Sequence, residues 1–232
     1  MSHTLSVLMP FYNERQTLEE IVKRVLGSEP GVEIELVMVD DHSNDGSGNI
    51  AARLANAEPR VRLIRHDKNM GKGAGVRTAI AAATGSIAVI QDADLEYDPS
   101  DYRALIAPII AGDADVVYGS RFLRGNPPNA MPRVIFANKV LTAYANLLYG
   151  LKLTDMETCL KAVRMDLLKA LNLRSDRFGI EPEITARLAQ KKARFVEVPV
   201  SYDPRSYAEG KKIRCIDGFA AILHILKFRF TR

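Results

Sequence analysis

The chain has 232 residues, of which 47% are hydrophobic and 26% charged, and it carries a formal net charge of +4. This length supports one sizeable core and lies below the size at which cores usually split, so we expect a single domain over residues 1–232. The absence of low-complexity runs excludes extended disorder. The modest positive charge is compatible with anionic lipid headgroups or phosphate-bearing substrates, and we expect no nucleic-acid partner.

The two cysteines, Cys159 and Cys215, lie far apart and in no metal-ligand spacing. They predict neither a disulfide framework nor a zinc site, and they favour a reduced, cytoplasmic setting. The chain runs from Met1 into a strand-like segment without the basic region or cleavage site of a signal peptide. No stretch reaches the roughly 20 apolar residues that a membrane-spanning helix needs, so we expect a protein that does not cross the bilayer.

In the first half, short runs rich in Val, Ile and Leu alternate with mixed segments of helical length, among them Thr17–Leu26 and Ala74–Ala83. Thr17 with Glu20 three residues later predicts a capping box at the first of these helices. Strands separated by helices predict an α/β fold with a doubly wound, mostly parallel, Rossmann-like sheet. The predicted strands are Leu5–Met9, Ile34–Val39, Val61–Ile64, Ile87–Ile90 and Asp115–Tyr118.

The second half is less regular. Glycine, asparagine and prolines predict a loop over Arg121–Pro132, before an amphipathic helix at Val134–Tyr149. A shorter helix is predicted at Pro182–Gln190, a strand at Arg194–Val200, and a terminal apolar helix with basic flanks at Asp217–Phe230. This last helix either packs on the core or lies in a membrane interface, and both interpretations stay open.

Three polar clusters directly follow predicted strands: Pro10–Glu14, Val39–Ser47 and Gln91–Glu96. In open α/β sheets, ligands bind beyond the carboxyl ends of the strands, so these clusters are the candidate site. The third contains Asp92 and Asp94, separated by one residue. Two such carboxylates cannot both be buried without a cation, because each loses several kcal/mol of solvation, so either a metal or a solvated turn must accommodate them. Mg²⁺ and Mn²⁺ accept carboxylate oxygens and complete their shells with water and phosphates, which makes Asp-Ala-Asp a candidate metal site.

Four motifs make the chain resemble family 2 glycosyltransferases of the GT-A fold, since they occur in that family's order and at its intervals. The similarity is greatest to the dolichyl-phosphate mannose synthase and polyprenyl-phosphate glucosyltransferase branch, and it extends over nearly the whole chain. Later matches include Gly119–Arg121, Thr154–Asp155 and Glu197–Lys211. The four motifs are Pro10-Phe-Tyr-Asn-Glu14, Val39-Asp-Asp-His-Ser-Asn-Asp-Gly46, Asn69-Met-Gly-Lys-Gly73 and Asp92-Ala-Asp94.

The resemblance implies a metal-dependent hexosyltransferase whose residues 1–120 bind the nucleotide sugar and whose residues 121–232 bind the acceptor. It places Pro10, Tyr12, Glu14, Val39 and Asp41 around the base and ribose. It places Asp92, Ala93 and Asp94 at the ribose and at Mg²⁺ or Mn²⁺, with Glu96 as a further metal ligand where relatives of this branch often have Gln.

The same resemblance assigns Arg121, Arg205 and Lys211 to the phosphates of donor or acceptor, and Arg133 to the acceptor phosphate. Asp94 and Arg121 are therefore expected to take part in catalysis. Negative charge develops on the leaving nucleoside diphosphate, and a metal with fixed cations stabilises it.

The acceptor decides whether a base is needed. A polyprenyl phosphate is already an anion and needs none, whereas an alcohol would have to lose its proton to a carboxylate. Asp155, ahead of Glu157, is the candidate for that role because it matches the family. The Asp155–Lys161 run and the Glu181-Pro182-Glu183 sequence depart from the better-known synthases, so the donor, GDP-mannose or UDP-glucose, and the acceptor are less defined than the reaction class.

Transfer to a polyprenyl phosphate at the cytosolic membrane face is the leading hypothesis. The alternatives are a soluble family 2 enzyme with a sugar or other alcohol acceptor, and a nucleotide-binding protein without transferase activity. A homo-oligomer or a membrane partner subunit stays open. Gly71-Lys72-Gly73 is interpreted as a tight turn into a helix, because the residue after Lys72 is neither Ser nor Thr as in a phosphate-binding P-loop.

Overall fold

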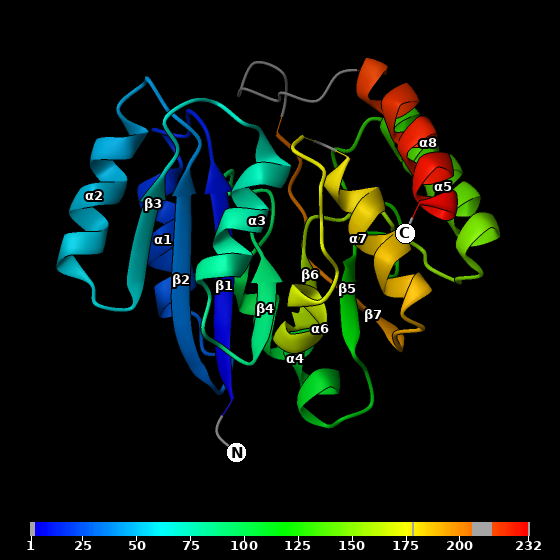
Figure 1. The fold of residues 1–232 in the computed structure, drawn as a ribbon, viewed down its shortest axis with the longest axis horizontal. Helices are drawn as coiled ribbons and strands as arrows, with labels where there is room; N and C mark the ends of the chain where they lie inside the picture. Colours follow the sequence, from blue (N-terminus) through cyan, green and yellow to red (C-terminus); the bar gives the residue numbers. More distant parts are fainter. Residues whose placement is uncertain (1–2, 178, 206–214, 232) are drawn as a thin grey trace.

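The computed structural model describes residues 3–177, 179–205 and 215–231, with side chains from residue 220 onward in the last of these. Its centre is one seven-stranded sheet in the order β3-β2-β1-β4-β6-β5-β7 (Figure 1). Every pairing is parallel except those of β6, which runs antiparallel to both neighbours. The strands are β1 (Thr4–Phe11), β2 (Glu33–Asp40), β3 (Val61–Arg65), β4 (Ile87–Ile90), β5 (Val116–Ser120), β6 (Lys161–Arg164) and β7 (Phe195–Pro199).

Helices cover both faces of this sheet, so the predicted doubly wound, mostly parallel α/β fold is confirmed. Helices α1, α2 and α4 contribute to one layer of the core, and α3, α5, α6, α7 and α8 contribute to the other. The helices are α1 (Leu18–Gly27), α2 (Ser47–Ala57), α3 (Lys72–Ala82), the 3₁₀ turn η1 (Pro99–Asp101), α4 (Tyr102–Ile110), α5 (Pro132–Tyr149), α6 (Met165–Lys169), α7 (Ile180–Gln190) and α8 (Cys215–Phe230).

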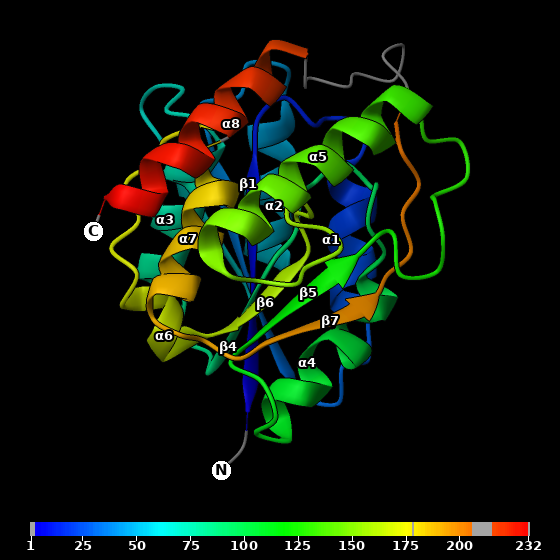
Figure 2. The same cartoon turned by 90° about the vertical axis from the view of Figure 1, so that its right-hand side faces the viewer.

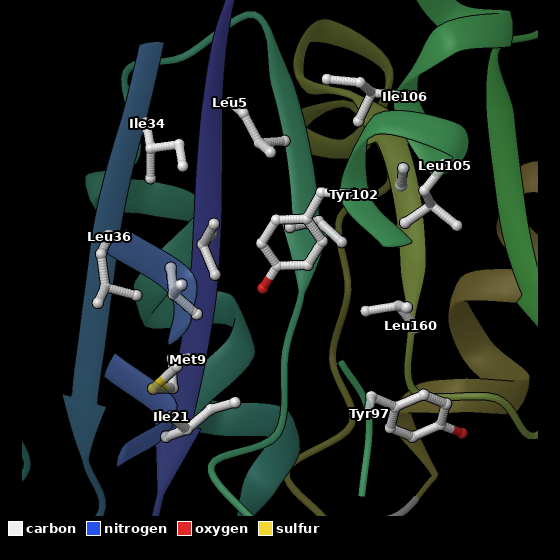
Figure 3. Packing of buried hydrophobic residues seen from close by; sticks show 14 of the residues in the cluster. Leu5, Met9, Ile21, Ile34, Leu36, Tyr97, Tyr102, Leu105, Ile106 and Leu160 are labelled. Carbon is white, nitrogen blue, oxygen red and sulfur yellow. The ribbon is translucent and has the colours of Figure 1, made fainter. Parts of the chain in front are cut away.

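The central strands are apolar because both of their faces are covered. All of β1 after Thr4 is buried, as is the whole of β4. Such strands have continuous hydrophobic runs in place of the alternating pattern of a half-exposed strand. Figure 3 shows one layer, in which Leu5 and Met9 of β1 meet Ile21 of α1 and Tyr102 of α4.

The start of α1 differs from the prediction. Thr17 makes no side-chain cap to the helix, and its hydroxyl donates to Glu14, with 3.1 Å between Thr17 Oγ1 and Glu14 Oε2. Glu20 pairs instead with Arg24 one turn later at 2.8 Å. The predicted capping box is therefore wrong. Glu14 is one of the residues assigned to the candidate site, and it takes the hydroxyl that would have capped the helix.

Strand β6 and helix α6 were not predicted. Strand β6 is only four residues long, Lys161–Arg164, and begins and ends with a basic residue. Its first residue, Lys161, is fully buried because its ammonium group contacts Glu181 on α7. A lysine in a short segment gives no hydrophobic pattern, so the sequence alone could not reveal that this strand lies between β4 and β5.

Helices α5 and α8 pack against each other and against α7 at one end of the molecule (Figures 1 and 2). No helix in the part of the chain that the structure describes has the length and apolar character to cross a membrane. The predicted boundaries of α5 and α7 agree with the structure to within two residues, and the predicted terminal helix is observed as α8.

Candidate functional site

The candidate site lies at the carboxyl ends of β1, β2 and β4, where the three polar clusters meet. The segment after β7 also reaches this edge, because Arg205 contacts residues from two of the clusters. Its guanidinium lies 3.0 Å from Glu14 Oε2 and 3.1 Å from Asp94 Oδ2. The crossover connections of the parallel sheet therefore bring residues about 190 positions apart in sequence into one group.

Asp94 is held in a strongly acidic environment. Burial and the neighbouring carboxylates of Asp92 and Glu96 raise the pKa of Asp94 to about 7, although Arg205 acts in the opposite direction. Glu96 accepts hydrogen bonds from the Tyr202 hydroxyl and from the Arg205 backbone N–H, each at 2.9 Å. The charged form of Asp94 is therefore costly here, and a cation beside it would relieve that cost.

Asp92 is paired differently. The ammonium group of Lys72 lies 2.8 Å from its Oδ1 and 2.9 Å from its Oδ2. Burial is the largest influence and acts to raise the pKa of Asp92, but Lys72, Cys159 and Lys161 together lower it below the ordinary value. Lys72 also lies 3.2 Å from Glu181 Oε1 and 3.1 Å from the Cys159 sulfur. The lysine of the Gly-Lys-Gly turn is thus part of the site.

Asp41 organises the loop that leads into α3. Its two oxygens accept hydrogen bonds from the Met70 and Gly71 backbone N–H groups at 2.8 and 2.7 Å, and Oδ1 lies 2.8 Å from His66 Nδ1. Gly71 has φ +95°, the left-handed region that favours glycine, so the predicted tight turn into the helix is confirmed. The contact of Asp41 with base or ribose stays a prediction.

The other residues assigned to the nucleotide lie around this edge. Pro10 and Val39 are paired neighbours on β1 and β2, and Val39 is fully buried. Ala93 is buried between the two aspartates, whereas Tyr12 is half-buried. Lys211 lies outside the described residues.

Arg121 and Asp155 form a second charged group. Arg121 Nε and Nη2 donate to the two oxygens of Asp155 at 2.6 and 2.7 Å, and the Arg121 backbone N–H donates to Oδ2 at 3.0 Å. Asp155 is fully buried, and the guanidinium carbon of Arg121 lies 5.1 Å from the ring centre of Tyr202. Both oxygens of Asp155 are therefore engaged by the arginine that it orients.

A cavity of about 690 Å³ connects these groups with α5. Asp94, Arg121 and Arg205 line its charged part, and Met131, Val134 and Ile135 line its apolar part. Arg133 is exposed in the first turn of α5 and is not among the lining residues. The remaining lining residues are Gln16, Thr17, Leu95, Phe122, Pro127, Asn129, Ala130, Asn138, Tyr202, Asp203 and Pro204.

The carboxylates of Asp92 and Asp94 are the kind of ligand that a hard divalent cation requires. Asp94 is also destabilised in its charged form, which a bound cation would relieve. Within the described ranges, however, no three His, Cys, Asp or Glu side chains are arranged to hold a metal ion. Asp92 faces Lys72, Asp94 faces Arg205, and Glu96 binds Tyr202. The predicted trio of ligands is thus not assembled in this arrangement.

Several residues of the site were not predicted from the sequence. Lys72 was interpreted only as part of a turn, and Tyr202, which contacts both Glu96 and Arg121, was not assigned a role. Glu181 was noted as part of a sequence that departs from the better-known synthases, and in the structure it pairs with Lys72 and Lys161. One signal could have identified Lys72: it is a basic residue in a glycine-rich turn that follows a parallel strand.

A solved structure shares the fold of this chain. Glucosyl-3-phosphoglycerate synthase from Mycobacterium tuberculosis, solved with Mn²⁺, UDP and phosphoglyceric acid, superposes with a TM-score of 0.74 over 99% of this chain and 80% of its own. Its sequence is 20% identical, so this likeness defines the fold, which is GT-A-like as predicted.

Sequence comparison then gives the family. The model of glycosyl transferase family 2 matches residues 6–171, and the chain belongs to that family. It is 31% identical to dolichol-phosphate mannosyltransferase of Pyrococcus furiosus over 89% of this chain, which spans 58% of that longer protein. It is 30% identical to undecaprenyl-phosphate mannosyltransferase of Micrococcus luteus, with 93% of this chain and 90% of the relative covered. The predicted family and its polyprenyl-phosphate branch are confirmed.

Proposed function

We propose that this chain transfers a hexose from a nucleotide sugar, GDP-mannose or UDP-glucose, to a polyprenyl phosphate. The observation that carries the proposal is the 690 Å³ cavity, which has Asp94, Arg121 and Arg205 in one part and apolar residues of α5 in another. A phosphorylated isoprenoid has the same division between a charged head and an apolar chain. The names of the relatives from Pyrococcus furiosus and Micrococcus luteus, which use such acceptors, support the same choice.

The donor would bind at the edge formed by β1, β2 and β4. Tyr12, Asp41 and the adjoining strand ends are proposed to surround the base and ribose, as the family resemblance implies. Asp92 and Asp94 would hold Mg²⁺ or Mn²⁺ against the diphosphate, with Glu96 as a further ligand if its side chain leaves Tyr202. When bound, the metal would stabilise the negative charge that develops on the leaving diphosphate.

Arg205 is proposed to bind the same diphosphate. It bridges Glu14 and Asp94, and its own backbone N–H is fixed by Glu96. Glu14 already holds the guanidinium through both of its oxygens, at 3.0 and 3.3 Å, and a phosphate beside Asp94 would offer it shorter charge-assisted hydrogen bonds. We propose that Lys211 contributes a second cation there, as the family resemblance implies.

The acceptor phosphate would lie near Arg121. Because this acceptor is already an anion, the reaction needs orientation and charge compensation more than a base. Asp155 supports that role, since both of its oxygens hold Arg121 and it presents no free oxygen that could take a proton. We therefore assign Asp155 to positioning Arg121, in place of the base role considered for an alcohol acceptor. Arg133, exposed beside the apolar part of the cavity, would meet the acceptor phosphate as it enters.

The surface near the cavity suits a lipid boundary. Helix α5 exposes Phe136 by 70% and Leu147 by 79%, and α8 exposes Leu223 by 68% and Phe230 by 77%. Large apolar side chains that are this exposed on neighbouring helices are typical of interaction surfaces. The basic residues Arg133, Lys139, Lys227 and Arg229 lie on the same two helices. We propose that α5 and α8 rest on the cytosolic face of a membrane, where a lipid-linked acceptor would be supplied.

A transfer assay tests the function. The protein is incubated with Mn²⁺ and radiolabelled GDP-mannose or UDP-glucose, together with a polyprenyl phosphate in detergent. We expect label in the organic phase with one donor, and none when the unphosphorylated polyprenol or a soluble sugar replaces the acceptor. Label that follows the polyprenol or the soluble sugar equally well would contradict the proposal.

A further inference from the structure

Lys72 occupies a position that the chemistry of donor binding does not explain by itself. Its ammonium group contacts both oxygens of Asp92, a carboxylate assigned to a divalent cation. Only 14% of the lysine side chain is exposed. A cation that binds Asp92 must therefore share its oxygens with a positive charge already in place, in surroundings where charge interactions are stronger than in water.

Other buried charges hold Lys72 in this position. Glu181 Oε1 lies 3.2 Å from Lys72 Nζ, while Glu181 Oε2 is bound by the fully buried Lys161. The Lys161 ammonium also lies 4.9 Å from the ring centre of Tyr118. Negative and positive side chains alternate from Asp92 through Lys72 and Glu181 to Lys161. Each of these charges is therefore stabilised by neighbours of the opposite sign. If Lys72 were displaced, Asp92 would lose the lysine that neutralises it and Glu181 would lose one of its two lysine partners. Leaving a buried charge without its partner is costly.

The backbone of Lys72 is fixed as well. The carbonyl of Asp176 accepts a hydrogen bond from Ala74 N at 3.0 Å, and it lies so close to Gly71 that an added Cβ would be 2.6 Å away. The loop that carries Asp176 is held in turn by Glu183, which is fully buried and accepts from Ser175 N at 2.7 Å. Both glutamates of the Glu181-Pro182-Glu183 sequence therefore fix Lys72, one through its side chain and one through the loop.

We propose that Lys72 is the fixed counter-ion of Asp92 and that it makes cation binding at Asp92 depend on a diphosphate. This inference rests on the proposed function, because it assumes that a nucleoside diphosphate and a divalent cation share the site. Without the diphosphate, Lys72 repels an incoming cation. A bound diphosphate adds negative charge that compensates both the lysine and the metal, so each ligand strengthens binding of the other.

Binding measurements with Mn²⁺ alone and with Mn²⁺ plus saturating UDP or GDP test this coupling by calorimetry. In the wild type we expect the nucleotide to strengthen Mn²⁺ binding by about 5- to 150-fold, the usual range for coupled sites. Lys72→Met should bind Mn²⁺ alone at least about threefold more tightly and lose most of the coupling, because the competing charge is gone. Lys68→Met, at an exposed lysine four residues earlier, is the matched control and should behave as the wild type.

Glu181→Gln gives an independent test if Lys72→Met does not fold. This variant keeps the lysine charge but removes its second carboxylate, so Mn²⁺ alone should bind more weakly than in the wild type and the coupling should persist. Opposite shifts in the two variants distinguish a counter-ion from a structural residue, whose loss would weaken binding in both. A folded Lys72→Met variant with unchanged Mn²⁺ affinity and coupling would overturn the inference, as would tighter or unchanged Mn²⁺ binding in Glu181→Gln. Absence of Mn²⁺ and nucleotide binding in the wild type would overturn the proposed function itself.

Discussion

Arg121 and Asp155 form a two-pronged ion pair in which Nε–Oδ2 is 2.6 Å and Nη2–Oδ1 is 2.7 Å, with the carboxylate fully buried. Asp155 N in turn donates to Glu197 on β7 at 3.0 Å. This arrangement fixes the direction of a guanidinium that lines the cavity. The pair therefore contributes to the site through the geometry of its arginine.

Asp155→Asn should destabilise the fold by about 3–5 kcal/mol, because removing one member of a buried pair leaves the other charge uncompensated. Urea unfolding measures this loss. The exposed pair Arg164–Asp166, at 2.6 Å, provides the control, and Asp166→Asn should cost no more than about 1 kcal/mol.

The double variant Arg121→Met/Asp155→Leu separates stability from function. It removes both charges, so it should recover much of the stability lost in Asp155→Asn while staying inactive, because the guanidinium is absent. Recovery of transfer in the double variant would show that Arg121 does not serve the substrate.

Glu157 should make stability depend on pH. Burial raises its pKa from the ordinary glutamate value of 4.5 to about 7, and its buried Oε1 has no hydrogen-bond partner among the described residues. Between those two pH values the folded state holds a proton that the unfolded state has released, so stability is lost as pH rises from about 4.5 to about 7. Glu157→Gln removes this dependence.

Urea unfolding at about pH 5 and at about pH 8 tests this. The variant should be similar to the wild type at the lower pH and more stable by up to about 3 kcal/mol at the higher one. Glu20→Gln is the control, because the pKa of Glu20 is lowered by its hydrogen bond to Arg24 and it stays ionised throughout this range. A constant difference between Glu157→Gln and wild type at the two pH values would contradict the account.

If α5 and α8 rest on a membrane, replacing their exposed apolar side chains should weaken lipid binding. Phe136→Ser and Leu223→Ser remove exposed apolar side chains from α5 and α8. Each should weaken co-sedimentation with anionic liposomes by roughly tenfold or more, since burying a large apolar side chain contributes about 1.5–3 kcal/mol. Ile110→Ser, at a 40% exposed position on α4, is the control and should have no effect. Equal losses at all three positions would contradict the assigned surface.

Sequence patterns were sufficient for the parts of the fold that repeat a simple rule. The buried runs of β1, β2 and β4 predicted a parallel sheet, and the acidic clusters after them predicted where Glu14, Asp41 and Asp94 would meet. The sequence patterns did not predict which side chains contact each other. The capping box at Thr17 was wrong because its hydroxyl binds Glu14, a contact between residues outside the helix.

The strand β6 and the Lys72 network share one reason for being missed. Both depend on Lys161 and Glu181, which lie 20 positions apart and can be buried only because each neutralises the other. Charged residues in a sequence indicate solvent exposure unless their partners are known. The local pattern around Lys161 therefore concealed a strand, and the pattern around Lys72 indicated only a turn.

Cross-linking tests the central claim, that the cavity between the acidic site and α5 holds a phosphorylated isoprenoid. A polyprenyl phosphate carrying a photoreactive group near its phosphate end would be irradiated with the protein, and the labelled peptides identified by mass spectrometry. We predict labelling within residues 127–138, which excess unlabelled polyprenyl phosphate abolishes and unphosphorylated polyprenol does not. Labelling confined to other parts of the chain, or displaced equally by the polyprenol, would contradict the account.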